Sequence, residues 1–125
     1  MAREHYTTQG APAAVGPYSQ AVRAGEFVYL SGQTAQDPET GQMTLGDVGA
    51  QTERIFQNLE AVLRAAGKTF DDVVKVSVFL TSIADFAAMN AVYARIFSAP
   101  YPARTTVAVA ELPLGARVEI DLVAR

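Results

Sequence analysis

Hydrophobic and polar positions alternate along several short stretches of the chain and recur at helical spacing along two longer ones. Alternation with a period of two is typical of a strand with one buried face, and recurrence every three or four residues is typical of a helix that packs by one side. The pattern predicts strands at 19–23, 27–32, 73–80, 102–110 and 117–123, an edge strand within 3–8, and helices at 48–66 and 82–97.

Glycine, proline and capping residues mark the ends of these elements. Gly25 stands in the turn of a predicted hairpin, and Gly67 follows the last apolar residue of the first helix, where a glycine commonly ends it. Ser82 and Asp85 resemble a capping box at the start of the second helix. Residues 10–18 contain two glycines and two prolines and are predicted to form a loop that ends in Tyr18.

The order of elements predicts an α+β fold, in which a mixed β-sheet carries both helices on one face. At 125 residues we expect a single domain, 1–125. Half of the residues are hydrophobic, so apolar surface is expected to remain after folding. The sheet face without helices is the natural place for it, and a second copy of the chain is the simplest cover.

Charge and composition exclude several classes of function. The net charge of −3 provides no basic field for a phosphate backbone, so we expect no nucleic-acid partner. The chain has no cysteine and one histidine, His5, which leaves no support for thiolate chemistry, a serine–histidine pair or a histidine-based metal site. No apolar run resembles a signal peptide or a membrane span, so we expect a soluble cytoplasmic protein with no membrane association.

Candidate chemistry is concentrated in the last two predicted strands. If these strands pair directly, Arg104, Thr106 and Ala108 share one face with Arg117, Glu119 and Asp121, although a third strand could lie between them. An arginine that grips a carboxylate and a glutamate that handles a proton would form a small site for an acidic substrate. The alternative is a solvated sheet face with ordinary charges.

Other polar positions allow both structural and functional interpretations. Asn90 lies within the apolar stripe of the second helix, so its amide either ties down a loop or lines a pocket. Gly32, at the end of a strand, would let a ligand approach the backbone. The pair Asp71–Asp72 has no further ligand pattern around it and is interpreted as a solvated loop.

Several motifs together resemble those of the RidA/YjgF family of reactive-intermediate deaminases. They occur in the family's order and are spread over nearly the whole chain. They are Gly16-Pro17-Tyr18-Ser19-Gln20-Ala21, Ser31-Gly32-Gln33, Asn90 followed by Tyr93, Pro102-Ala103-Arg104, Leu112-Pro113 and Val118-Glu119-Ile120. The resemblance implies a chorismate-mutase-like α+β fold and a homotrimer with sites in clefts between subunits. It also implies cofactor- and metal-free hydrolysis of enamines and imines, such as 2-aminoacrylate and 2-iminobutyrate, to 2-oxo acids and ammonia.

The resemblance also assigns roles to individual residues. Arg104 would grip the substrate carboxylate, and the Gly32 N–H beside Ser31 would add a donor. Glu119 would position or activate water. The remaining positions of the family pattern are Tyr18, which would close the pocket, Asn90 and Pro113.

One position departs from the family. Many relatives carry a cysteine where this chain has Thr106, which excludes thiol chemistry there but leaves a hydroxyl for the pocket. Two alternatives to imine hydrolysis remain: a related small-molecule hydrolase, and a non-catalytic 2-oxo acid binder or chaperone-like protein with the same fold.

Overall fold

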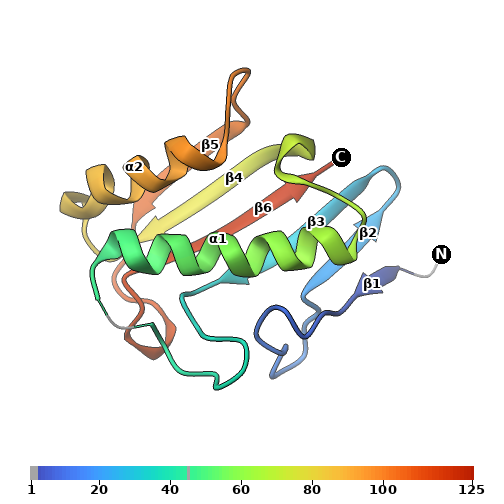
Figure 1. Cartoon of the computed structure of the whole chain (residues 1–125), viewed down its shortest axis with the longest axis horizontal. Helices are drawn as coiled ribbons and strands as arrows, with labels where there is room; N and C mark the ends of the chain where they lie inside the picture. Colours follow the sequence, from blue (N-terminus) through green and yellow to red (C-terminus); the bar gives the residue numbers. More distant parts are fainter. Residues whose placement is uncertain (1–2, 45) are drawn as a thin grey trace.

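The computed structural model describes residues 3–44 and 46–125. Its strands are β1 (Glu4–Tyr6), β2 (Ala21–Ala24), β3 (Phe27–Gln33), β4 (Val73–Leu80), β5 (Ala103–Ala108) and β6 (Val118–Ala124), and its helices are α1 (Val48–Ala65) and α2 (Phe86–Ile96). Figure 1 shows both helices lying across one face of a single sheet. The predicted α+β class and the placement of both helices on one face are therefore confirmed.

The six strands have the order β1-β2-β3-β6-β4-β5, and only β4 and β5 are parallel neighbours. Helix α2 connects these two strands, as a parallel pair requires. The last strand, β6, then enters the sheet between β3 and β4 and runs antiparallel to both. Of the two arrangements left open for 102–110 and 117–123, direct pairing is wrong and an interposed third strand is confirmed, because β4 lies between them.

This insertion places the charged residues of β5 and β6 on different faces. Arg104 is level with Val76, which is level with Leu122, so these three side chains share the helix-covered face. Val107, Phe79 and Glu119 form the equivalent row on the open face. Arg104 and Glu119 were expected to share a face only if their strands paired directly. With β4 between the strands, the register places the two side chains on opposite faces.

Element boundaries follow local signals. Asp47 accepts a hydrogen bond from the Ala50 N–H at 2.8 Å and begins α1, while Gly67, at φ +74°, follows its end as predicted. The second helix begins later than predicted. Ser82 caps a 3-10 turn, Ile83–Asp85, and α2 proper begins at Phe86. Asp72 accepts from the Thr69 N–H at 2.8 Å, so its role in the described structure is a local cap.

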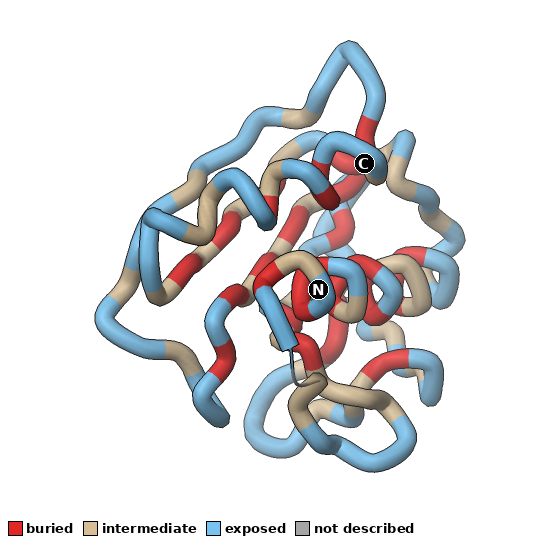
Figure 2. Tube along the Cα trace, turned by 60° about the vertical axis from the view of Figure 1, so that its left-hand side comes forward, coloured by how far each residue is buried: buried red, intermediate tan, exposed pale blue. Residues whose placement is uncertain are grey.

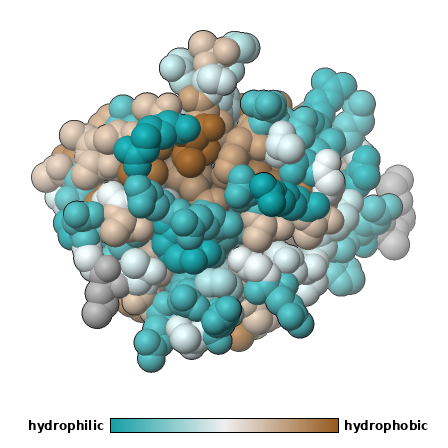
Figure 3. All heavy atoms as spheres, viewed as in Figure 1, coloured by the Kyte–Doolittle hydropathy of each residue, from teal (hydrophilic) through white to brown (hydrophobic). Residues whose placement is uncertain are grey.

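The core lies between the helices and the sheet. Buried and part-exposed residues alternate along the central strands (Figure 2), and β6 buries Val118, Ile120 and Leu122. From α1, Ile55, Phe56 and other apolar side chains cover them. Apolar side chains also gather between the two helices in Figure 3, where a hollow of about 230 Å³ is bordered by an ion pair of Arg95 and Glu53.

The open face of the sheet combines apolar and charged side chains. Tyr29, Val74 and Val107 are 40 to 45% exposed there, although each belongs to a strand. Between them lies a polar group in which the Lys75 ammonium donates to the Thr105 hydroxyl at 2.7 Å. Neither helix of the described chain is long and apolar enough to cross a membrane.

Candidate functional site

The residues predicted to form one site lie in two separate hollows of the chain. The first, of about 460 Å³, is lined by Asn90, Tyr93 and Ala94 of α2 and by Tyr101, Pro102 and Arg104 at the start of β5. The second, of about 260 Å³, is lined by Tyr18, Gly32, Pro113 and Glu119 together with neighbouring loop residues. Ser31 and Thr106 are not among the lining residues of either hollow.

Arg104 is held by α2 rather than by a carboxylate. Its Nη1 donates to Asn90 Oδ1 at 2.6 Å, and its guanidinium carbon lies 4.6 Å from the Tyr93 ring centroid and 5.3 Å from that of Phe86. Within 3–44 and 46–125, Arg104 forms no ion pair, whereas Arg64, Arg95, Arg117 and Arg125 each have a carboxylate partner. The side chain is exposed at the hollow, so its positive charge is available to an anion from outside.

Asn90 is oriented as the helical stripe predicts. Its position on α2 faces β5, and its amide oxygen meets the arginine that follows Pro102. Asn90 therefore lines the hollow and holds the Arg104 guanidinium there, while its direct contact with a ligand stays a prediction.

Glu119 lies on the open face beside a bulge in β3. Between Leu30 and Gln33 the strand β3 contains one residue more than the facing part of β6, and this bulge places Gly32 against the Glu119 carboxylate. A Cβ added to Gly32 would overlap with Glu119 Oε2. A glycine is therefore required here to make room for the carboxylate of β6.

Burial raises the pKa of Glu119, and the negative charge of Asp121 raises it further. Burial also raises the pKa of Asp121, while the hydrogen bond from Ser77 and the charge of Lys75 oppose that rise. A glutamate whose ionised form is disfavoured binds a proton more readily than a solvated one. The second hollow therefore contains a carboxyl group suited to proton transfer.

Loop 10–18 is held in place by Gln20, a residue of the motif Gly16-Pro17-Tyr18-Ser19-Gln20-Ala21. The buried Gln20 amide accepts from the Thr8 N–H at 2.7 Å and donates to the carbonyl oxygens of Thr8 at 3.1 Å and Pro12 at 2.8 Å. Ser31 donates its hydroxyl to the Ser19 carbonyl oxygen at 2.6 Å. These bonds tie down the two ends of the loop that carries Tyr18, a residue that is 52% exposed.

Two buried hydroxyls have no hydrogen-bond partner in the described chain: Tyr93 Oη and Thr106 Oγ1. Thr106 is on the same side of β5 as Arg104, two residues further along, and level with the buried Val78. The residue that replaces the frequent family cysteine thus has its hydroxyl enclosed rather than exposed to the first hollow.

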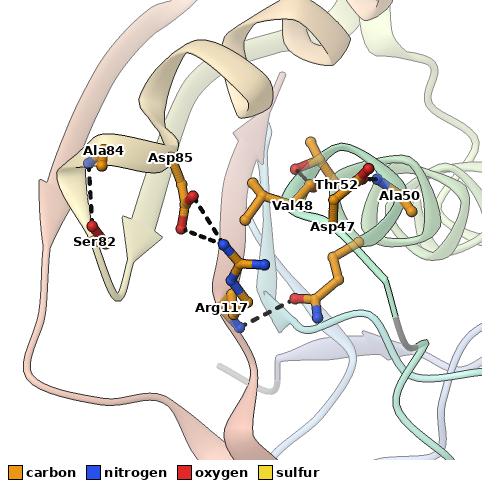
Figure 4. Close-up of polar contacts among 9 residues, drawn as sticks. Asp47, Val48, Ala50, Thr52, Ser82, Ala84, Asp85 and Arg117 are labelled. Atoms are coloured by element: carbon orange, nitrogen blue, oxygen red, sulfur yellow. Dashed lines mark hydrogen bonds and ion pairs between the residues drawn. The ribbon is translucent and has the colours of Figure 1, made fainter.

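Arg117, predicted on the same face as Arg104, has a structural partner instead. Figure 4 shows its guanidinium against the carboxylate of Asp85, with distances of 3.0 and 3.1 Å, while its backbone N–H donates to Gln51 of α1 at 3.1 Å. These contacts join the start of β6 to α1 and to the 3-10 turn that precedes α2. Asp85 therefore binds an arginine instead of completing the predicted capping box.

Comparisons with known proteins identify the family. A family model described as Endoribonuclease L-PSP matches residues 8–125. The chain belongs to this family, that of the RidA/YjgF proteins. Protein DfrA of Myxococcus xanthus is 52% identical over 99% of this chain and 96% of its own length. A protein of Dermatophagoides farinae named 2-iminobutanoate/2-iminopropanoate deaminase is 47% identical over 92% of this chain and 90% of its own.

A solved structure agrees with the fold. The crystal structure of E. coli TdcF with bound serine has a TM-score of 0.91 and 40% identity, and the match covers 97% of each chain. The family and its fold are therefore established for this chain, whereas its relatives carry several different names.

Proposed function

We propose that the protein is a hydrolytic deaminase that converts imines and enamines of small 2-amino acids, such as 2-iminobutyrate and 2-aminoacrylate, into 2-oxo acids and ammonia. The observation that carries the proposal is Arg104, a guanidinium without an ion-pair partner in the described chain that is held at the wall of a hollow. A 2-imino acid presents a carboxylate to it. The serine bound to TdcF, itself a small amino acid, and the name of the Dermatophagoides relative support this substrate class.

The reaction needs orientation and the movement of two protons from water to nitrogen. Water adds its oxygen to the imine carbon while Glu119 accepts one proton and returns it to the nitrogen, which gives a carbinolamine. The carbinolamine hydroxyl then gives its proton through Glu119 to the nitrogen, the C–N bond breaks, and ammonia leaves as the 2-oxo acid forms. An enamine first accepts a proton at its terminal carbon and loses one from its nitrogen to become the imine. Because the imine carbon is already electrophilic, positioning and proton transfer account for the catalysis.

We propose that the working site is shared between two copies of the chain in a homotrimer. Arg104 and Glu119 of one chain lie on opposite sheet faces, so one chain does not bring them together. One copy would supply Arg104 and Asn90, and the next would supply Tyr18, Gly32, Pro113 and Glu119. Burial of the open face, with its exposed Tyr29 and Val107, would hold the copies together.

The first test is a coupled assay. A dehydratase generates 2-iminobutyrate or 2-aminoacrylate in situ, and the rate of 2-oxo acid formation is measured with and without the protein. We expect acceleration that is lost in Arg104→Ala and largely lost in Arg104→Lys, because lysine lacks the planar fork. Arg95→Ala, which removes an exposed arginine paired with Glu53, serves as the matched control. An unaccelerated rate with the wild-type protein would refute the proposed activity.

The shared site has its own test, in which two inactive variants are mixed. Arg104→Ala and Glu119→Gln chains are unfolded together in equal amounts and refolded. In a random trimer mixture, three quarters of the trimers contain both chains and each has one intact site of three, so about a quarter of wild-type activity should return. No recovery, with trimers confirmed by light scattering, would show that each site belongs to one chain.

A third measurement addresses the description of the family model. RNA is offered as a substrate under the same conditions, and we expect no cleavage, because the net charge of −3 does not attract a phosphate backbone. RNA cleavage that is abolished in Arg104→Ala would instead favour a ribonuclease.

A further inference from the structure

Arg104 lies over two aromatic rings from one face of α2. Phe86, Asn90 and Tyr93 are spaced by four and then three residues, so they lie along one side of the helix. The guanidinium carbon is 5.3 Å from the Phe86 ring centroid and 4.6 Å from that of Tyr93. The Nη1 group of the same guanidinium donates a hydrogen bond to Asn90 Oδ1. Both distances lie within the range of cation–π attraction.

The two rings are themselves fixed. Tyr93 is 5% exposed and packs against Phe97 at 4.8 Å and Phe56 at 6.0 Å between centroids. Phe86 is the first residue of α2 and packs against the edge of the core. A side chain with several rotatable bonds is therefore held over a rigid surface, which lowers the entropy that it loses when an anion binds.

The chemical nature of these partners matters as much as their rigidity. Arg125 also contacts a ring, Phe27, at 5.8 Å, but its charge is compensated by Glu26 at 3.0 Å. Arg104 instead has rings and a neutral amide, which attract the cation without supplying a negative charge. Only one of its five N–H groups is used by Asn90, so the others are available to a carboxylate.

We infer that Phe86 and Tyr93 are positioning residues that hold the Arg104 guanidinium in the orientation in which it binds the substrate carboxylate. The part of this inference that concerns substrate binding rests on the proposed function. The Tyr93 hydroxyl has no partner in the described chain, so the ring rather than the hydroxyl performs this role. The two aromatic residues would act through Arg104 and not touch the reacting atoms.

Three variants distinguish the contribution of the aromatic rings to ligand binding from that of the Tyr93 hydroxyl and from that of core packing. Tyr93→Phe retains the ring, Tyr93→Leu removes it, and Phe86→Leu removes the ring that is less enclosed by the core. We expect Tyr93→Leu and Phe86→Leu to raise the Kd for 2-oxobutyrate and the KM for the imine by about two- to thirtyfold. We expect kcat to change less and Tyr93→Phe to remain within about twofold of the wild type. Equal losses in Tyr93→Phe and Tyr93→Leu would overturn the inference, because the hydroxyl would then be responsible.

A second readout does not depend on activity. The Arg104 side-chain N–H resonances, assigned by their disappearance in Arg104→Lys, should be shifted by the ring currents in the wild-type protein and return toward ordinary arginine positions in Phe86→Leu. Unchanged resonances in both leucine variants would overturn the inference even if the protein is a deaminase. Conversely, a wild-type protein that neither hydrolyses the imine nor binds 2-oxobutyrate refutes the proposed function, while these resonances still decide the role of the rings.

Discussion

Replacing Asn90 by aspartate tests whether the open charge of Arg104 is what recognises the substrate. The side chain keeps its shape, but its oxygen, 2.6 Å from Arg104 Nη1, becomes part of a carboxylate. This carboxylate would pair with the guanidinium and occupy the charge that a substrate needs. We therefore expect ligand binding to weaken even though every neighbouring contact of Arg104 remains.

The size of the loss follows from the exposure of the two groups. Two unit charges 4 Å apart interact by about 1 kcal/mol in water and about 4 kcal/mol at an effective dielectric of 20. Because Arg104 is exposed and Asn90 half-buried, the repulsion between the new carboxylate and an incoming one should lie near the lower value, about 1 to 2 kcal/mol. That corresponds to roughly five- to thirtyfold weaker binding.

The assay is a calorimetric titration with 2-oxobutyrate, followed by the coupled rate measurement. Gln57→Glu provides the matched control, since it makes the same amide-to-carboxylate change on the exposed side of α1. Asn90→Ala removes the hydrogen bond without adding charge, and we expect a smaller loss than for aspartate. The reasoning is refuted if Asn90→Asp binds 2-oxobutyrate as tightly as the wild-type protein.

Three further predictions concern the second hollow and its loop. Glu119→Gln should nearly abolish turnover yet increase the free energy of unfolding at pH 7. Burial raises the pKa of Glu119 in the folded protein, so its ionisation above the unfolded pKa costs the wild-type protein stability that is regained as pH falls. Urea unfolding from pH 4 to 8 would contradict this if the wild type and the variant lost stability equally as pH rises. Gly32→Ala should displace the Glu119 carboxylate, lower kcat and cost about 1 to 3 kcal/mol, and wild-type kcat would show that the carboxylate's position is unimportant. Gln20→Ala should cost about 1 to 3 kcal/mol and increase amide hydrogen exchange in residues 8–18, whereas unchanged exchange would mean that its bonds do not order the loop.

Local patterns in the sequence were sufficient to predict the elements of the fold. Alternation predicted β4 and β6, within 73–80 and 117–123, and helical spacing predicted α1, within 48–66. An element with one buried face carries apolar residues at its own structural period, so the period identifies the element. Gly67 was predicted to end α1 because a left-handed residue after a helix favours glycine. Asn90 was expected to face the sheet for the same periodic reason.

Only the tertiary structure decided how these elements combine. A strand pattern does not specify its neighbour, and the insertion of β6 between β3 and β4 placed Arg104 and Glu119 on opposite faces. The contact of Gly32 with Glu119 joins residues far apart in the chain, and the side-chain bonds by which Gln20 supports the Tyr18 loop follow no periodic pattern. The sequence by itself determined which residues are chemically capable and which faces of β4, β6 and the two helices are apolar, but not which face of the sheet the residues of β5 occupy. Their distribution over two separate hollows followed from non-local strand pairing, which no local periodicity encodes.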